Sequence, residues 1–241
     1  EFILTTIDQA IYRAISAPAG PVHLNCMFRE PLVSTGKKKD YKSYLTSVDS
    51  WQNNTNPFTT YISSEKNINN DTLKKVTAIL NKEKQGILLV SCLKKENDRK
   101  AVTKLIEKLS WPAFVDIRSG LKMGAKASNI ISYYDQILLS DKFSRMKQPL
   151  TVLHVGGNIT SKRLNLFIQQ NEIERYIHID NHPFRWDPNH QISHRLEVDI
   201  GNFVKKIMPL LIGKTTSLSL KYFQKADRVI GNIIDNHMQS E

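Results

Sequence analysis

Residues 151–163 read Thr-Val-Leu-His-Val-Gly-Gly-Asn-Ile-Thr-Ser-Lys-Arg and place a strand, a turn and a helix start within one short stretch. The apolar run 151–155 is typical of a strand buried in a parallel sheet. Gly156-Gly157 interrupts that run, because glycine accepts backbone angles that other residues resist. Thr160 or Ser161 then offers a side-chain oxygen that can cap the helix that follows.

Lys162 and Arg163 open the predicted helix and bring two positive charges to its first turn. Free backbone N–H groups and the positive end of the helix dipole add to those charges. The stretch therefore predicts an anion-binding corner. The alternative is an ordinary joint between strand and helix, in which both side chains are simply solvated.

The same alternation of strand and helix continues on both sides of this stretch. Strands are expected at 86–90, 112–116, 151–155, 176–180 and 196–200, and helices at 71–82, 97–109, 129–139, 162–170, 202–211 and 218–238. Alternating strands and helices indicate an α/β fold, with a Rossmann-like parallel sheet covered by helices on both faces.

Ligands of such sheets bind where the strands end at their carboxyl edge. Three polar or glycine-rich segments follow predicted strands and should meet at that edge: 118–120, 156–157 and 180–182. We therefore expect the carboxyl edge of the sheet to carry the functional site.

The chain before residue 71 has a different texture. Residues 1–32 suggest one αβ unit, with a helix at 1–16 and a short strand at 22–25 in which His23 is expected to be a buried, satisfied histidine. Residues 33–70, rich in Ser, Thr, Lys and Asn, suggest a linker with one short helix. The central domain is expected at 71–212, and 213–241 as a helix leading to a further domain, so the chain looks cut from a longer protein.

Composition limits the possible partners. The net charge of +11 favours acidic partners such as nucleic acid or an anionic membrane. The charge is scattered, however, with its densest run at 37–39, and no nucleic-acid motif or bilayer-spanning segment is evident. Cys26 and Cys92 lack metal-ligand spacing and an activating base, which indicates a reducing, cytoplasmic compartment and inert buried thiols. No metal site is expected.

Four motifs carry a resemblance to a known family. The chain has G-P-V-H-L-N-C-M-F-R-E-P-L at 20–32, W-P-x-x-x-D-x-x-S-G-L at 111–121, G-x-x-T-S-K-R-L at 157–164, and D-x-H-P-x-R-x-D-P-x-H-x-x-x-H-R at 180–195. In order and content they resemble MenD, the thiamine-diphosphate-dependent 2-succinyl-5-enolpyruvyl-6-hydroxy-3-cyclohexene-1-carboxylate (SEPHCHC) synthase family of menaquinone and phylloquinone biosynthesis. Met27 departs from the family's usual proline.

The resemblance implies a central-domain fragment that is inactive alone. The parent enzyme would be a thiamine-diphosphate-dependent transferase, homodimeric or homotetrameric, that adds decarboxylated 2-oxoglutarate to isochorismate. Thiamine diphosphate and Mg²⁺ would be bound by the flanking domains, because neither their G-D-G metal motif nor the pyrimidine-domain glutamate segment is found here. No catalytic or cofactor-binding residue is therefore assigned to this chain. The alternative is a stand-alone nucleotide- or flavin-binding Rossmann module, although no G-x-G-x-x-G follows a strand.

The resemblance assigns substrate binding to Lys162 and Arg163, which fall on the family's K-R pair. Both substrates are dicarboxylates, and Arg suits bidentate carboxylate binding while Lys offers a point charge. A salt bridge within the domain is the alternative for Arg163. Some relatives are feedback-inhibited through arginines near a domain interface, and whether Arg118 belongs to such a site stays open.

Other residues in the motifs are expected to have structural roles. The acids and bases of the loop after the strand at 176–180 should form a hydrogen-bonded network: Asp180, Arg185, Asp187 and Arg195. The polar and aromatic residues of the first motif are expected to be positioning residues: Asn25, Phe28, Arg29 and Glu30.

Overall fold

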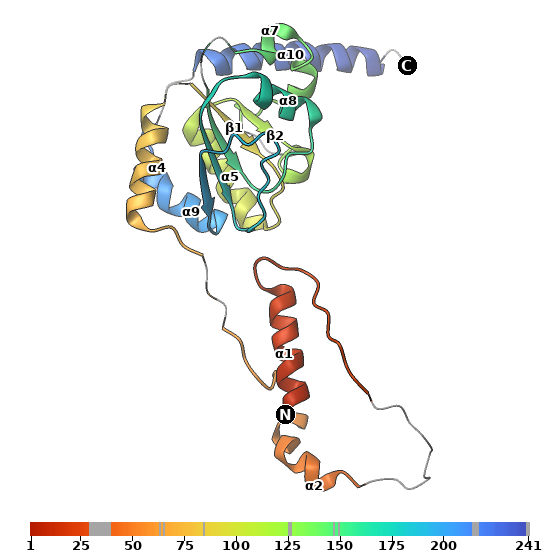
Figure 1. Ribbon diagram of the computed structural model, residues 1–241. Helices are drawn as coiled ribbons and strands as arrows, with labels where there is room; N and C mark the ends of the chain where they lie inside the picture. Colours follow the sequence, from red (N-terminus) through yellow and green to blue (C-terminus); the bar gives the residue numbers. More distant parts are fainter. Residues whose placement is uncertain are drawn as a thin grey trace. The chain divides into compact units, whose positions relative to one another are not determined.

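The chain forms two compact units, Glu1–Ser64 and Glu65–Glu241, called here the N-terminal unit and the core unit (Figure 1). The computed structural model describes residues 1–28, 40–62, 64, 66–83, 85–124, 127–146, 148, 150–213 and 217–239. Arg29, Glu30 and the lysines at 37–39, singled out from the sequence, lie outside the described residues.

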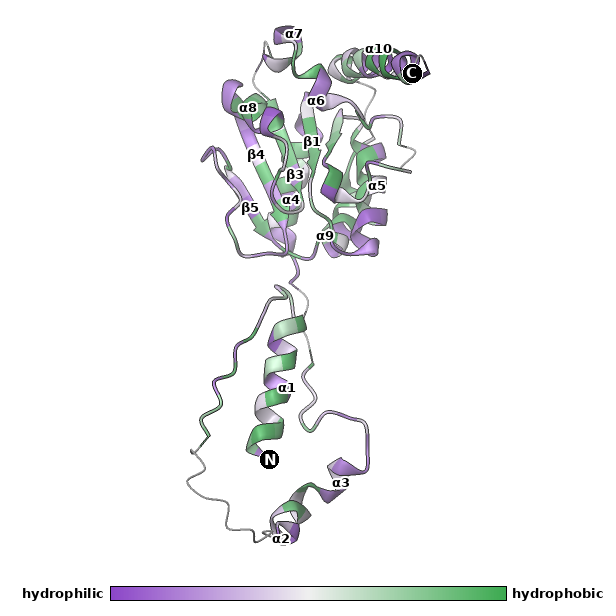
Figure 2. Ribbon diagram, turned by 90° about the vertical axis from the view of Figure 1, so that its right-hand side faces the viewer, coloured by the Kyte–Doolittle hydropathy of each residue, from purple (hydrophilic) through white to green (hydrophobic). Residues whose placement is uncertain are grey.

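A five-stranded parallel sheet forms the centre of the core unit, with strand order β2-β1-β3-β4-β5. Its strands are β1 (Gly86–Val90), β2 (Ala113–Val115), β3 (Leu150–Val155), β4 (Ile173–Asp180) and β5 (His194–Glu197). Hydrophobic residues gather on the central strands β1 and β3, whereas β5 at the edge is largely hydrophilic (Figure 2). The predicted parallel α/β sheet is confirmed.

Helices cover both faces of the sheet, as the sequence predicts. Leu88 and Val90 point to one face, which packs against α4 (Asn70–Lys82), α5 (Glu96–Leu109) and α9 (Ile200–Ile207). Ile87 and Leu89 point to the other face, which packs against α6 (Tyr134–Ile137), α8 (Lys162–Gln170) and α10 (Leu218–Gln239). The alternation along β1 follows from the two-residue period of a strand. The short elements η2 (Ile117–Ser119), α7 (Asp141–Ser144) and η3 (Met208–Leu210) complete the core unit.

Side-chain caps explain where the helices begin. The Asn69 side chain accepts a hydrogen bond from Thr72 N at the start of α4, and Asp199 accepts one from Asn202 N at the start of α9. Ser161 caps α8 by accepting from Leu164 N at 3.0 Å, so the second of the two predicted caps is the one used. Each cap satisfies a backbone donor that the helix leaves unpaired.

The predicted helix at 129–139 is wrong over its first half, since α6 covers only Tyr134–Ile137. Ile130 instead forms an isolated parallel bridge with Ala113. The buried Asn129 amide donates to the carbonyl oxygens of Ile106 and Trp111. This segment thus extends the edge of the sheet beside β2 instead of starting a helix.

The N-terminal unit contains α1 (Phe2–Ile15), α2 (Lys42–Leu45), η1 (Thr46–Val48) and α3 (Asp49–Gln52). Residues 22–25 are not a strand, because no described segment of the unit pairs with them. His23 and Cys26 are exposed rather than buried as expected. Asn25 and Phe28 are also exposed, and their positioning role stays a prediction.

Candidate functional site

The turn after β3 can only be built with glycine at its first position. Gly156 has φ +97°, and a Cβ placed on it would lie 2.7 Å from the carbonyl oxygen of Cys92. Its N–H donates to Ile179 O on β4 at 2.9 Å, and the N–H of Gly157 donates to Cys92 O at 3.3 Å. The turn therefore lies pressed against the chain that leaves β1.

Two carboxylate side chains fix the segment between this turn and α8. Asp116, which follows β2, accepts hydrogen bonds from both the N–H (2.9 Å) and the hydroxyl of Thr160. Asp135 on α6 accepts a hydrogen bond from the Ser161 hydroxyl. The first turn of α8 is thus attached to two neighbouring elements. Asp116 belongs to a motif recognised in the sequence, but its bond to Thr160 crosses 44 residues and no local pattern predicts it.

Lys162 and Arg163 are exposed on this fixed helix start. They line a cavity of about 400 Å³ together with Ser161, Asp135 and Leu166. Neither side chain forms an ion pair within the described part of the chain, so the salt bridge considered for Arg163 is not found there. Their charges are therefore available to an anionic ligand.

The three segments expected at the carboxyl edge of the sheet do meet. Arg118, Gly157 and Asp180 line one cavity of about 270 Å³, which also includes Cys92, Lys94, Asp98, Asn158, Asn181, His182, Trp186 and Ile200. Arg118 Nη1 donates to Asn158 Oδ1 at 2.9 Å. The cavity lies at the end of β1 and β3, which are adjacent in the sheet. The strand after β1 in the sequence, β2, lies on one side of this pair, and the strand after β3, β4, lies on the other. Ligands of open α/β sheets bind at such a reversal of strand order. Lys162 and Arg163 line the separate cavity of about 400 Å³. The sequence therefore predicts that the three segments meet, but not that the cationic pair faces a different cavity.

The loop between β4 and β5 is held by its own polar side chains, as predicted. Asp187 accepts from the N–H groups of Gln191 and Ile192, and Arg195 Nη2 donates to His182 O at 2.6 Å. Asp180 Oδ1 accepts from Asn181 N, and Arg185 Nη2 contacts His190 Nδ1 at 3.3 Å. The partners are backbone groups and a histidine, and no ion pair among these four acids and bases is found in the described chain.

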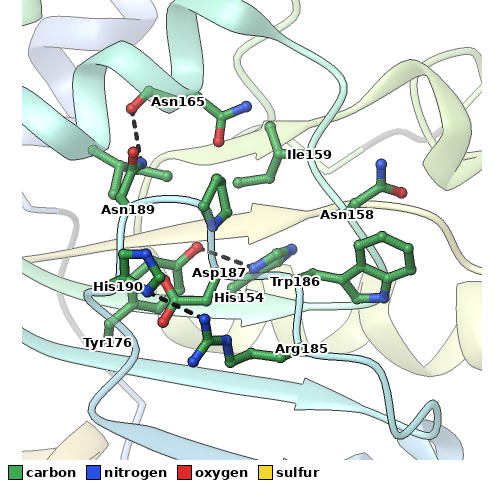
Figure 3. Close-up of a pocket in the computed structure, with 12 residues that line it drawn as sticks. His154, Asn158, Ile159, Asn165, Tyr176, Arg185, Trp186, Asp187, Asn189 and His190 are labelled. Carbon is green, nitrogen blue, oxygen red and sulfur yellow. Dashed lines mark hydrogen bonds between the residues drawn. The ribbon is translucent and has the colours of Figure 1, made fainter.

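A third cavity, of about 420 Å³, lies under this loop (Figure 3). Its lining includes Asn165 on α8, Tyr176 on β4 and His154 on β3, and it shares Asn158 and Trp186 with the edge cavity. Sequence reasoning missed this site. The available signal was His154, a histidine within an apolar strand, whose place beside Tyr176 becomes visible only once the register of β3 and β4 is known.

Burial controls the ionisation of these groups. Desolvation lowers the pKa of His154 well below its usual value, and the neighbouring His178 lowers it further. Desolvation also lowers the pKa of His178, although its bond to Gly156 O opposes the shift. Burial raises the pKa of Tyr176, and Asp187 adds to that effect. Both histidines are therefore neutral near pH 7 and Tyr176 keeps its proton.

Two features that the described residues lack bear on cofactors and membranes. These residues contain no group of three or more His, Cys, Asp or Glu side chains that could hold a metal ion. None of their helices combines the length and the apolarity that crossing a bilayer requires. The edge cavity contains Asp98 and Asp180, but these two carboxylates do not form such a group.

Comparison with known proteins gives the family. A family model described as "Middle domain of thiamine pyrophosphate" matches residues 42–240. SEPHCHC synthase of Rubrobacter xylanophilus is 33% identical over 198 residues, covering 82% of this chain and 33% of that enzyme. The synthase of Salinibacter ruber is 30% identical over 240 residues, covering 99% and 40%, and protein PHYLLO, chloroplastic, of Arabidopsis thaliana is 31% identical over 219 residues, covering 86% and 13%.

The chain thus spans 40% or less of the length of these curated relatives. Among solved structures, a putative thiamin diphosphate-dependent enzyme from Mycobacterium smegmatis matches with a TM-score of 0.45 and 13% identity, over 68% of this chain and 32% of that one.

Proposed function

Because the chain belongs to the family of thiamine pyrophosphate middle domains, we propose that it is the central domain of a SEPHCHC synthase. The parent enzyme would decarboxylate 2-oxoglutarate and join the resulting four-carbon unit to isochorismate. The similarity to two SEPHCHC synthases and to protein PHYLLO supports this proposal, while a stand-alone nucleotide- or flavin-binding module is not favoured by them. Residues 71–212 would form the central domain, residues 1–32 the end of the preceding domain, 33–70 a linker, and 213–241 the start of the next connection.

Thiamine diphosphate and Mg²⁺ would act in the neighbouring domains of the parent enzyme. When bound there, the cofactor would supply the chemistry for decarboxylation and for carbon–carbon bond formation. The described residues do not fit the metal-bound diphosphate, since they contain no cluster of metal ligands. No step through the cofactor is therefore assigned to this chain, and its contribution would be architecture and binding of acidic substrate.

The observation that carries the proposal is that Lys162 and Arg163 stand on a fixed helix start without an ion-pair partner in the described chain. Both cations stand on a helix start that is fixed by Asp116 and Asp135, yet neither is neutralised by an ion pair in the described chain. A cation on a fixed helix start lowers the cost of holding a dicarboxylate, because the backbone that carries it need not reorganise when the ligand binds. A guanidinium adds two parallel hydrogen bonds to a carboxylate.

The test is a pair of substitutions in the full-length enzyme. Lys162→Ala and Arg163→Ala should each raise KM for a dicarboxylate substrate by about tenfold, the loss of one charge-assisted hydrogen bond of roughly 1.4 kcal/mol. Lys104→Ala, which removes an exposed lysine from α5, is the matched control and should leave KM unchanged. Unchanged KM in both test variants would remove the pair from the substrate site.

The division of labour has its own test. The chain supplied with thiamine diphosphate and Mg²⁺ should not release CO₂ from 2-oxoglutarate. Turnover by this polypeptide without further domains would contradict the assignment of catalysis to the flanking domains.

A further inference from the structure

The glycine turn before α8 has a partner for every backbone polar group. The two N–H groups donate to Ile179 O and Cys92 O. The carbonyl oxygen of Gly156 accepts from His178 Nε2 at 2.8 Å, and that of Gly157 accepts from Ser91 Oγ at 2.6 Å. Backbone alone supplies half of these partners, and buried side chains supply the other half.

The side-chain half continues as a chain of hydrogen bonds into the sheet. Ser91 Oγ lies 2.8 Å from His154 Nε2, and His154 Nδ1 lies 3.1 Å from the Tyr176 hydroxyl. Because Ser91 donates its only proton to Gly157 O, it must accept from Nε2–H of His154. Nδ1 is then the acceptor, and Tyr176 donates to it. A single assignment of protons therefore satisfies every hydrogen bond in the series from the Tyr176 hydroxyl to the carbonyl oxygen of Gly157.

His178 binds the other carbonyl oxygen of the turn, and its ring stacks on that of His154. The hydrogen-bonded series Tyr176–His154–Ser91 is called here the relay. His154 and His178 are register partners on β3 and β4, with ring centroids 4.4 Å apart. Both are almost fully buried, as are Ser91 and Tyr176. Since Nε2–H of His178 donates to Gly156 O, protonation at Nδ1 would place a buried positive charge against the stacked ring of His154.

The charged and titratable groups around the two rings come from three elements. Tyr176 and Asp180 belong to β4, Asp187 to the loop that follows it, and Arg195 to β5. Asp187 is already bound by two backbone N–H groups, and Arg195 by His182 O. No carboxylate is hydrogen-bonded to either ring in the described chain, so the neutral arrangement is the one that the surroundings favour.

Two facts argue that this network does more than satisfy core polar groups. Apolar side chains would be the usual choice at the ends of central parallel strands, yet Ser91, His154 and His178 stand there. Ser91 and His178 bond the turn directly, and His154 is linked to it through Ser91. The far end of the relay, Tyr176, also lines the 420 Å³ cavity, as Figure 3 shows. The relay thus joins a cavity wall to the loop that precedes the cationic helix start.

We propose that Ser91, His154, Tyr176 and His178 are positioning residues: they hold the Gly156-Gly157 turn and thereby set the direction in which α8 presents Lys162 and Arg163. The inference rests on the proposed substrate role of that pair. The rigid path is short, because the turn leads through Thr160 and Ser161, both tied to neighbouring carboxylates, directly into Lys162.

The first experiment measures the turn itself in this chain. Tyr176→Phe removes one hydroxyl and should shift the ¹⁵N–¹H amide signals of Gly157 and Lys162, although the substitution lies in another strand. Tyr222→Phe removes the hydroxyl of a partly exposed tyrosine on α10 and should leave those signals in place. Unmoved Gly157 and Lys162 signals in Tyr176→Phe would overturn the proposal.

The second experiment measures the consequence in the full-length enzyme with 2-oxoglutarate as the varied substrate. Tyr176→Phe should raise KM about threefold while kcat stays within twofold, and His178→Leu should raise it further. His178→Gln keeps an N–H donor for Gly156 O and should restore much of the loss, which a purely space-filling role would not predict.

The outcomes separate this inference from the proposed function. If Lys162→Ala raises KM but Tyr176→Phe does not, the positioning role is overturned and the substrate role stands. If Lys162→Ala and Arg163→Ala both leave KM unchanged, the proposed substrate role fails, and with it the step from the turn to substrate. If His178→Leu does not fold, Tyr176→Phe alone decides.

Discussion

Helices α1 and α8 both have amphipathic sequences, but their apolar residues differ in how far they are exposed. In α8 the apolar residues Leu164, Phe167 and Ile168 are about 1% exposed and pack on the sheet. In α1 no residue is buried, and Phe2 and Ile11 are more than half exposed. An apolar stripe predicts that a helix packs, but the partner surface must come from elsewhere in the protein.

The comparison extends to the two units as wholes. The core unit combines a continuous five-stranded sheet with two hydrophobic clusters, one on each face of that sheet. In the described part of the N-terminal unit, α1 contacts the later segment through isolated interactions, such as Asp8 accepting from Thr59 N at 2.7 Å and the stacking of Tyr12 on Tyr61. We therefore expect stability to reside in the core unit and the stripe of α1 to be covered by another part of the parent enzyme.

The largest difference should come from replacing one apolar side chain in each of these two helices by alanine. Phe167→Ala leaves a cavity in a closed core and should lower the free energy of unfolding by about 3–5 kcal/mol. Ile11→Ala removes an exposed side chain and should change it by less than about 0.5 kcal/mol. Urea denaturation of this chain, followed by near-UV circular dichroism, measures both. A loss above 2 kcal/mol for Ile11→Ala would mean that α1 is packed in solution.

Sequence and structure agree where the determinants are local. The glycine turn, the Ser161 cap and the parallel alternation depend on residues within a few positions of each other, and the structure confirms them. The strand predicted at 22–25 does not form, because a strand needs a neighbour that no described segment provides. His23 is exposed for the same reason.

The parts of the site that the sequence did not predict depend on register. Ser91 and His154 are separated by 63 residues, and their hydrogen bond exists only because β1 and β3 pair with Val90 opposite Val155. A one-residue slip would turn every side chain to the other face of the sheet. Periodicity places each histidine in a strand but cannot show that the two rings stack.

A second comparison uses glycines, because three of them differ in what a side chain would meet. Gly156→Ala combines φ +97° with a 2.7 Å approach to Cys92 O and should cost about 2–4 kcal/mol. Gly124→Ala has φ +86° in open space, and its backbone strain alone should cost about 1 kcal/mol. Gly20→Ala in the N-terminal unit meets nothing within 4 Å and should be close to neutral.

Thermal unfolding of the three glycine variants gives the ranking. Equal melting temperatures for the variants at Gly156 and Gly124 would show that the contact with Cys92 relaxes at little cost. A large loss for Gly20→Ala would place more order in the N-terminal unit than its open surroundings indicate.

Acid should weaken the core unit through its two buried histidines. Both pKa values are lowered in the folded chain, so the unfolded chain binds protons first as pH falls below about 6.5. Their contribution to stability is complete above that pH and is lost below it, by up to about 1.4 kcal/mol per histidine and pH unit. Urea unfolding between pH 7 and 5 measures the slope. His178→Gln should flatten the slope, and a flat profile for the unmodified chain would contradict the burial argument.

The smallest expected effects come from two carboxylates with opposite pKa shifts. Burial and the nearby Asp199 raise the pKa of Asp98, whose Oδ1 accepts from Gly201 N at 3.0 Å. Burial also opposes ionisation of Asp199, but the Lys95 ammonium at 2.7 Å and the N–H of Asn202 outweigh it and lower its pKa. As pH rises above the unfolded value near 3.9, ionising Asp98 therefore costs stability in the folded chain. The stabilising contribution of ionised Asp199 is instead complete above that value and is lost as pH falls below it.

Asparagine substitutions should separate the two signs. Asp98→Asn keeps an acceptor for Gly201 N and removes the buried charge, so it should stabilise the chain at pH 7 by less than about 1 kcal/mol and have no effect at pH 3. Asp199→Asn keeps the helix cap but loses the attraction to a half-exposed Lys95, which should cost about 0.5 kcal/mol at pH 7. Urea unfolding at both pH values distinguishes them. A loss of stability for Asp98→Asn at pH 7 would mean that its charge is stabilised by Lys95 and Arg99 more than burial penalises it.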